Sequence, residues 1–151
     1  MKRYCIVTGL FIDIHGHGHT LQAAELGYLL TAAQLNAPST PPSNLTSIRA
    51  LASHVGGDFD ALLRGPRSFG ALLEGEGFAA VPSPTWRGPG ANEYFSGGYN
   101  TQVHGSVAGG VVDGIQIESP RSFRDQPMRA LYVTALVNTI EEYLRVNYGS
   151  L

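Results

Sequence analysis

The chain has 151 residues, a formal net charge of −2 and 43% hydrophobic residues, which suits a single folded domain. This charge and a pI of about 6.2 provide no basic surface for nucleic acid. No segment approaches the ~20 apolar residues that a membrane-spanning helix needs. We therefore expect one domain over residues 1–151 that binds neither nucleic acid nor a membrane. The single cysteine, Cys5, excludes an internal disulfide and is expected to be buried as a small apolar residue.

Two apolar runs are predicted to form the central strands of a sheet. Residues 4–14 are almost continuously apolar, and residues 111–117 form a second run that ends at Glu118. Such runs are typical of strands that are buried on both faces of a largely parallel sheet. We also expect extended structure over residues 24–33 and a short strand over residues 78–82. Together these elements predict an α/β fold with a mixed, largely parallel sheet flanked by helices.

Apolar residues at three- and four-residue spacing predict the helices. The expected ranges are 45–55 after a cap at Ser43 or Asn44, then 58–63, then 69–73 after a cap at Ser68, and finally 127–144 after a cap at Asp125 or Gln126. Residues 82–110 are rich in Gly, Pro, Ser, Asn and Tyr, and we expect an irregular loop there. A loop of this length in a compact domain usually carries a binding or active site.

Three histidines, His15, His17 and His19, follow the first apolar run and are separated by single glycines. They share one face if the strand continues, and each ring turns independently if it does not. Imidazole is a common zinc ligand, so all three are candidate metal ligands, and His15 is the first choice because it lies nearest the strand. Asp13 is positioned to orient His15. The alternative interpretation is that they are solvated loop histidines.

Glu118 stands at the carboxyl end of the second strand, where open α/β sheets bind ligands, and we expect it to lie across from the histidines. It is a candidate general base. The alternative is an ion pair with Arg121 or Arg124. Those two arginines, with Arg67 and Arg87, are also candidate clamps for a carboxylate, and Arg121 is the first choice because it lies three residues after Glu118.

Five short blocks together resemble the N-formylglutamate amidohydrolase-like group, which is related to the zinc carboxypeptidases and the aspartoacylase-type deacylases. The blocks are IDIHGH at 12–17, ELGY at 25–28, YFSGGYNTQ at 94–102, HGS at 104–106 and DGIQIESPR at 113–121. The resemblance extends over roughly residues 10–145. It implies a zinc-carboxypeptidase-like or phosphorylase/hydrolase-like fold with one catalytic zinc ion.

The resemblance also implies residue roles. In such enzymes zinc is held by a His and a Glu from an early H-x-x-E-like motif and by a His after a later strand, which His15 matches. Glu118 matches the glutamate that activates the zinc-bound water for attack on an amide carbonyl. Arg121, Asn100 and Tyr99 are then the candidate substrate-binding residues. The implied activity is hydrolysis of the amide bond of an N-acylated amino acid, a small-molecule or peptide substrate that bears a carboxylate.

The chain departs from the family pattern because it contains no H-x-x-E motif. Either it is the carboxyl-terminal part of a longer protein, or it is a short version in which His17 or His19 replaces a lost ligand. A second hypothesis is a non-catalytic binding module with a degenerate metal site, which holds its ligand with the loop at 94–106. Asp-x-His-x-His also resembles the barrel amidohydrolases, but that barrel needs ~250 residues and repeated strand–helix units.

Overall fold

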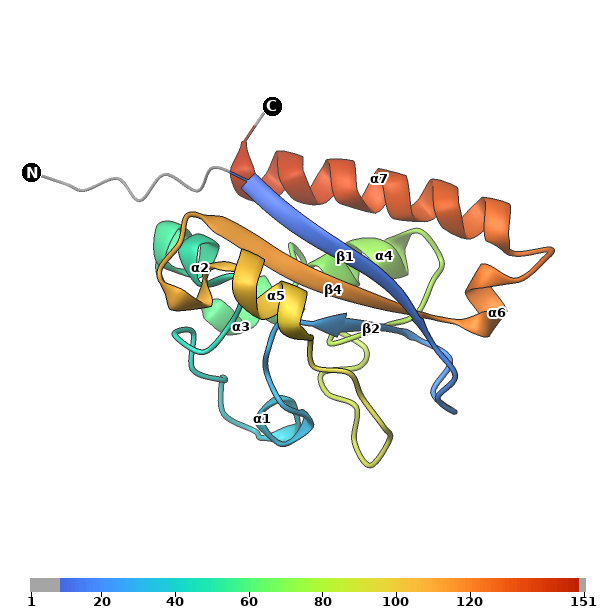
Figure 1. Cartoon of the computed structure of the whole chain (residues 1–151), viewed down its shortest axis with the longest axis horizontal. Helices are drawn as coiled ribbons and strands as arrows, with labels where there is room; N and C mark the ends of the chain where they lie inside the picture. The colour runs from blue at the N-terminus through green and yellow to red at the C-terminus, as the bar shows by residue number, and fades with distance from the viewer. Residues whose placement is uncertain (1–8, 150–151) are drawn as a thin grey trace, which may run out of the picture.

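The computed structural model describes residues 9–149 of the chain (Figure 1). The first part of the expected first strand, including Cys5, lies outside these residues. The strands are β1 (Gly9–His17), β2 (Ala24–Gly27), β3 (Ala80–Val81) and β4 (Val112–Pro120). The α-helices are α1 (Ala32–Asn36), α2 (Arg49–Val55), α3 (Phe59–Arg64), α4 (Phe69–Gly75), α5 (Tyr99–His104), α6 (Arg121–Arg124) and α7 (Arg129–Tyr148), and a 3-10 helix, η1 (Ser106–Ala108), precedes β4.

The strands form one mixed, mostly parallel sheet in the order β1-β4-β2-β3. β1 pairs with β4 in parallel and β2 pairs with β3 in parallel, whereas β2 runs antiparallel to β4. The two apolar runs of the sequence therefore lie side by side as the long strands β1 and β4. This arrangement confirms the predicted α/β fold with a mixed, largely parallel sheet flanked by helices.

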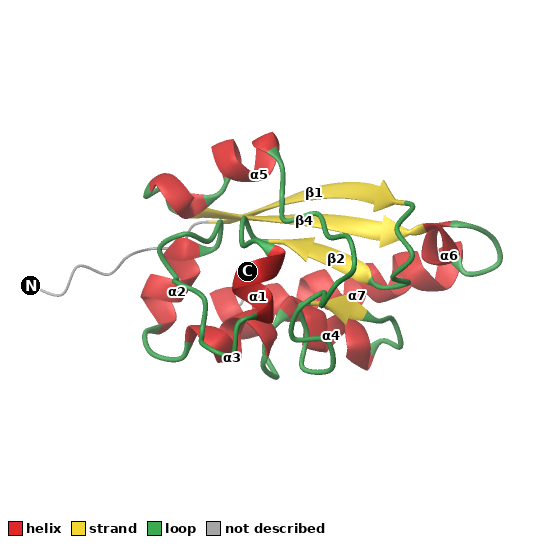
Figure 2. Cartoon of the chain, turned by 90° about the horizontal axis from the view of Figure 1, so that it is seen from below, coloured by secondary structure: helices red, strands yellow, loops and turns green. Residues whose placement is uncertain are grey.

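The helices cover the two faces of the sheet unequally (Figure 2). Helix α5 lies on one face, and α2, α3, α4 and α7 lie on the other. Ile115 and Ile117 of β4 belong to the fully buried core beneath the larger group of helices. Because side chains alternate along a strand, Gln116 and Glu118 point to the opposite face, which we call the α5 face. Gln116 and Glu118 thus lie on the face that carries the short helix α5.

Two predictions about the first half of the chain were wrong in part. β1 continues to His17, so His15 and His17 belong to the strand itself. The extended structure expected over residues 24–33 ends at Gly27, and α1 begins soon afterwards. Thr31 and Gln34 form a capping box there, which gives this short helix its first turn despite the weak apolar pattern.

The helix boundaries also differ from the predicted ones. Helix α2 begins only at Arg49, so neither Ser43 nor Asn44 caps it, whereas the predicted cap of α4 at Ser68 is confirmed. The last helix, α7, begins at Arg129 with Met128 at its N-cap, so the predicted cap at Asp125 or Gln126 was wrong. The short helix α6 and a turn precede it. The expected irregular loop contains α5 and η1. Among the described helices, none combines the length and the apolar character that a bilayer span requires.

Candidate metal centre

Within the described residues, His17, His19 and Glu25 form a group that could hold a metal ion. One potential ligand atom from each residue lies within 4.8 Å of the others. Nδ1 of His19 is 2.8 Å from Oε1 of Glu25, and Nδ1 of His17 is 3.6 Å from the same oxygen. The side chains of His17 and Glu25 are fully buried, and that of His19 is 15% exposed. The group is therefore shielded from bulk water, with His19 as its most accessible member.

Backbone contacts hold this metal group in place. His17 lies at the end of β1, and its Nε2 is 3.0 Å from the carbonyl oxygen of Ala23. The backbone N–H of His19 donates to Nδ1 of His17 at 3.1 Å, which assigns the ring proton of His17 to Nε2. Glu25 accepts a second hydrogen bond on Oε2 from the backbone N–H of Phe95, whose ring stacks on that of His19. The segment at 94–98 thus closes over the metal group.

Glu118 lies beside the metal group through strand register. On β4 it pairs directly with Glu25 of β2 on one side and with His15 of β1 on the other. Paired residues of neighbouring strands point to the same face, so all three side chains lie on the α5 face. Nε2 of Gln116 donates to Oε1 of Glu118 at 2.7 Å and orients the carboxylate. The expectation that Glu118 lies across from His15 agrees with this geometry.

His15 lies on the other side of Glu118 from Glu25. Its Nε2 is 2.9 Å from Oδ1 of Asp13, as expected for a carboxylate that orients it, and its Nδ1 is 4.0 Å from Oε1 of Glu118. Asn100 of α5 donates to Oδ2 of Asp13 at 3.2 Å. The ring of His15 is 46% exposed and is not part of the metal group. Its role as a metal ligand stays a prediction.

The predicted arginine clamps have other partners. Arg121 is 77% exposed, and its Nε lies 3.7 Å from a carboxylate oxygen of Asp125. Arg124 donates from Nε to the carbonyl oxygen of Ser119 and from Nη2 to that of His17. Neither guanidinium pairs with Glu118, so the ion-pair alternative for that residue was wrong. Tyr99 is 78% exposed at the start of α5.

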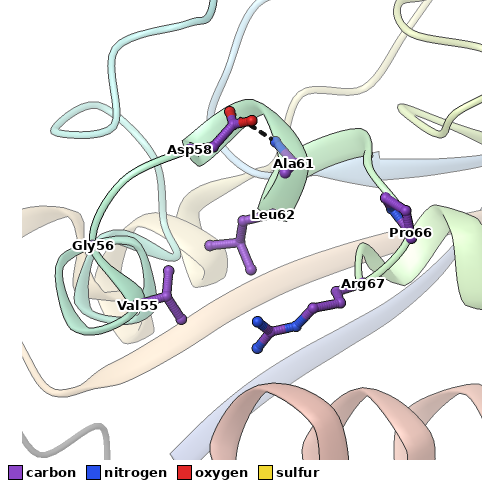
Figure 3. Close-up of a pocket in the computed structure, with 7 residues that line it drawn as sticks. All are labelled: Val55, Gly56, Asp58, Ala61, Leu62, Pro66 and Arg67. Carbon is purple, nitrogen blue, oxygen red and sulfur yellow. Dashed lines mark hydrogen bonds between the residues drawn. The ribbon is translucent and has the colours of Figure 1, made fainter.

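Arg67 and Arg87 lie elsewhere. Arg87 donates to Asp60, and Arg67 donates to the carbonyl oxygen of Val146. Arg67 also lines a cavity of about 290 Å³ between α2 and the α3–α4 connection (Figure 3). The carboxylate of Asp58 at this cavity is turned to the backbone N–H of Ala61, where it caps α3. The cavity contains none of the histidines, and we assign it no part in the site.

A buried carboxylate, Asp113, fixes the start of β4. It accepts hydrogen bonds from the hydroxyls of Ser106 and Tyr148 and from the backbone N–H of Leu51. Burial raises the pKa of Asp113, and these hydrogen bonds only partly oppose the rise. The contacts join α2, η1 and α7 to β4. They thereby hold the strand that carries Glu118 in register.

The sequence prediction did not include Glu25 among the ligands, although the block that contains it was part of the family resemblance. The available signal was a lone acid within the small apolar run of Ala24 and Leu26, six residues after His19. Glu25 is completely buried, as are both neighbours. Such a carboxylate needs charged or hydrogen-bonding partners, and two histidines precede it closely in the chain. The turn between β1 and β2 brings them together.

Comparisons of this chain with protein-family models, with curated proteins and with solved structures find no match.

Proposed function

We propose that the chain is a zinc-dependent hydrolase that cleaves the amide bond of an N-acylated amino acid. Zinc would be held by His17, His19 and Glu25, and Glu118 would act as the general base. The observation that carries this proposal is the position of Glu118 directly beside the metal group. Two imidazoles and one carboxylate are also the donor set of known catalytic zinc sites, which keep a fourth position open for water or substrate.

The surroundings of His17 fit a ligand role. Metal-binding histidines usually donate their second ring N–H to a carbonyl or carboxylate, which fixes the tautomer. His17 makes this contact through Nε2 to the carbonyl oxygen of Ala23, so Nδ1, which is 3.6 Å from Oε1 of Glu25, carries the lone pair. That lone pair accepts the backbone N–H of His19, a hydrogen bond that a bound cation would replace.

His19 and Glu25 fit the same role. Their 2.8 Å contact joins a ring nitrogen to a carboxylate oxygen, and a metal ion would take the place of the proton between them. Oε2 of Glu25 keeps its hydrogen bond from Phe95, so the carboxylate stays oriented. The stacked ring of Phe95 restricts the rotation of His19. Both ligands therefore have supporting contacts that do not depend on the ion.

The remaining chemistry belongs to Glu118. Zinc, when bound, supplies a Lewis acid that polarises an amide carbonyl and favours deprotonation of water. Glu118 would accept the proton of the attacking water and then donate it to the leaving amine. The hydrogen bond from Gln116 orients the carboxylate for this transfer. At only 6% exposure, Glu118 is protected from competing solvent.

Substrate binding would use exposed or polar side chains of α5 and α6. Asn100 and Arg121 are the proposed contacts for the substrate carboxylate, and Tyr99 is the proposed contact for the rest of the molecule. Asn100 now donates to Asp13, and Arg121 lies near Asp125, so each would exchange its partner on binding. By the same resemblance we propose a relationship to the N-formylglutamate amidohydrolase-like group and its zinc-carboxypeptidase-like fold.

Metal analysis tests this function most directly. Protein purified with zinc is expected to contain about one ion per chain, and Glu25→Gln and His19→Ala should lose it. His104→Gln is the matched control, because that ring packs on Phe11 and has no place in the metal group. Glu118→Gln should retain zinc but lose hydrolysis of N-formyl and N-acetyl amino acids. Wild-type protein that binds no zinc would refute the proposal.

The second candidate function is a non-catalytic binding module. It is favoured by the hydrogen bonds of the metal group, because both ring nitrogens of His17 already contact backbone groups and His19 already contacts Glu25. In that case the histidines stabilise the β1–β2 connection, and an acylated amino acid binds without turnover. Isothermal titration of zinc-treated protein with N-acetylglutamate, together with a hydrolysis assay, separates the two functions.

A further inference from the structure

β1 is the edge strand of the sheet and has only β4 as a strand neighbour among the described residues. In a parallel pair, alternate residues direct their N–H and C=O groups toward the neighbour, and the others direct them outward. The outward groups of this nine-residue strand are therefore available for a further strand. Long, exposed edge strands are the usual sites of strand addition between chains.

The middle of this edge is also apolar. Ile14 is 61% exposed, although Leu10 and Ile12, on the same face of β1, pack against the core. Helix α7 lies on the face of the sheet opposite α5 (Figure 2), and its Val133 and Val137 are about half exposed. Unpaired backbone groups and an exposed isoleucine thus lie on the same strand. An added strand would pair with the backbone groups and cover the isoleucine.

We propose that the β1 edge pairs with the β1 edge of a second copy of this chain, in an antiparallel ladder centred on Ile14. The occupant is a second copy because the exposed sequence complements itself in this arrangement. A two-fold axis at Ile14 places Asp13 opposite His15 of the second copy and His15 opposite Asp13 of the second copy. Ile14 then faces Ile14, and the two sheets join into one.

The pleat of the strand leaves few other registers. Facing residues must point to the same side of the sheet. The two-fold axis of the ladder therefore passes through a residue rather than between two residues. A centre on Asp13 would place two carboxylates in direct opposition, which is destabilising. A centre on His15 would place Ile14 against a glycine and leave its apolar surface uncovered. Only the centre on Ile14 places an imidazole opposite a carboxylate and also buries that isoleucine.

The arrangement also affects the candidate site. Asp13 and His15 lie on the α5 face, and His15 pairs in register with Glu118. The second copy would therefore add the carboxylate of its own Asp13 next to His15, on the side opposite Glu118. Each copy would then have a carboxylate of the other copy close to its own His15. The proposal itself does not depend on metal binding, because the ladder is formed by backbone groups and Ile14.

Sedimentation velocity of the full chain over the micromolar concentration range tests the association. The wild-type chain should form a dimer, and Ile14→Lys should weaken association at least about tenfold, because it places two lysines in opposition. Val103→Lys is the matched control: it also replaces an apolar residue that is about half exposed, but on α5. A wild-type chain that stays monomeric, or an unchanged dimer with Ile14→Lys, would overturn the proposal.

Cross-linking tests the register. Facing residues of an antiparallel ladder have Cα atoms about 4.5–5.5 Å apart, which lies within the range that a disulfide spans. In a Cys5→Ser background, Ile14→Cys should therefore yield a covalent dimer under mild oxidation. Ile12→Cys should not, because its thiols would be offset by four residues along the ladder. Equal cross-linking at both positions would overturn the proposed pairing.

Discussion

Glu25 on β2 and Glu118 on β4 are a directly facing pair of the antiparallel ladder, and both carboxylates are almost completely buried. Like charges in this position oppose each other. Each carboxylate has its own donors, a histidine ring and a backbone N–H for Glu25 and the amide of Gln116 for Glu118. These donors compensate for burial without removing the repulsion. A cation bound at Glu25 would remove it, which is why this pair is central to the proposed site.

The facing pair predicts that Glu118→Gln stabilises the metal-free protein. The amide keeps an oxygen that accepts from Gln116 and removes one of two opposing charges, so the free energy of unfolding should rise by about 0.5–1 kcal/mol. Urea denaturation in the presence of a chelator measures the change. Glu93→Gln, at an exposed position, should leave stability within about 0.5 kcal/mol of wild type. A loss of stability with Glu118→Gln would contradict the electrostatic argument.

His17→Ala should destabilise the protein whether or not metal is present. The ring is fully buried, and its removal leaves the carbonyl of Ala23 and the N–H of His19 without their partners. We expect a loss of about 2–4 kcal/mol, measured by chemical denaturation. His15→Ala is the comparison, since that ring is 46% exposed and should cost less than about 1 kcal/mol. Equal effects would show that His17 does not anchor the β1–β2 connection.

Gly27→Ala should displace the segment that covers the metal group. A Cβ at this position would lie 2.6 Å from the backbone nitrogen of Gly97. This contact is too short, so β2 or the segment that contains Gly97 would have to move. We expect a stability loss of about 1–3 kcal/mol and a weaker affinity for zinc, because the same segment carries Phe95. Thermal unfolding and zinc titration measure the two effects. Gly75→Ala has open space around its Cβ and should be neutral or stabilising by up to about 1 kcal/mol.

Asp60→Asn should destabilise the chain at neutral pH. Arg64 is almost fully buried and donates from Nε to Asp60 at 2.7 Å, so the substitution leaves its charge without a counterion. We expect a loss of about 2–4 kcal/mol in urea denaturation. Glu142→Gln is the control, because Glu142 and its partner Arg145 are both solvent-exposed and the loss of such a pair should change stability much less.

The same pair predicts a dependence on pH. Partial burial raises the pKa of Asp60, but hydrogen bonds from Arg87 and Arg64 outweigh it, and the pKa lies below its ordinary value. The stabilisation is therefore fully present above the pKa of the unfolded chain, about 4, and is lost as the pH falls through the folded-state pKa. The stability difference between wild type and Asp60→Asn should shrink in acid.

The contribution of Asp113 to stability should change with pH in the opposite direction to that of Asp60. Burial raises the pKa of its carboxyl, which therefore keeps its proton to a higher pH in the folded state than in the unfolded chain. Its contribution to the free energy of unfolding is greatest below about pH 4 and declines as the pH rises through the folded-state pKa. Asp113→Asn does not titrate, so this decline should be absent from its stability profile. Parallel profiles for the two proteins would contradict the assignment.

The sequence predicted the elements whose signals are local. A continuous apolar run favours a buried strand regardless of its neighbours, and the runs that became β1 and β4 were recognised in this way. Their parallel pairing then places His15 and Glu118 at the same end of the sheet. Helix α5 was missed because its six residues carry a weak apolar pattern and lie in a glycine-rich segment. Contacts with β1 and β4 stabilise this helix, and those contacts cannot be read from its own sequence.

The sequence by itself determined an α/β chain with histidines and Glu118 at the ends of neighbouring strands. Only the tertiary structure decided which histidines belong together, because His15 turns toward Asp13 while His17 and His19 approach Glu25. That choice depends on the antiparallel insertion of β2 between β4 and β3. Strand order and register are set by long-range packing, and a shift of one residue would move Glu25 to the other face of the sheet.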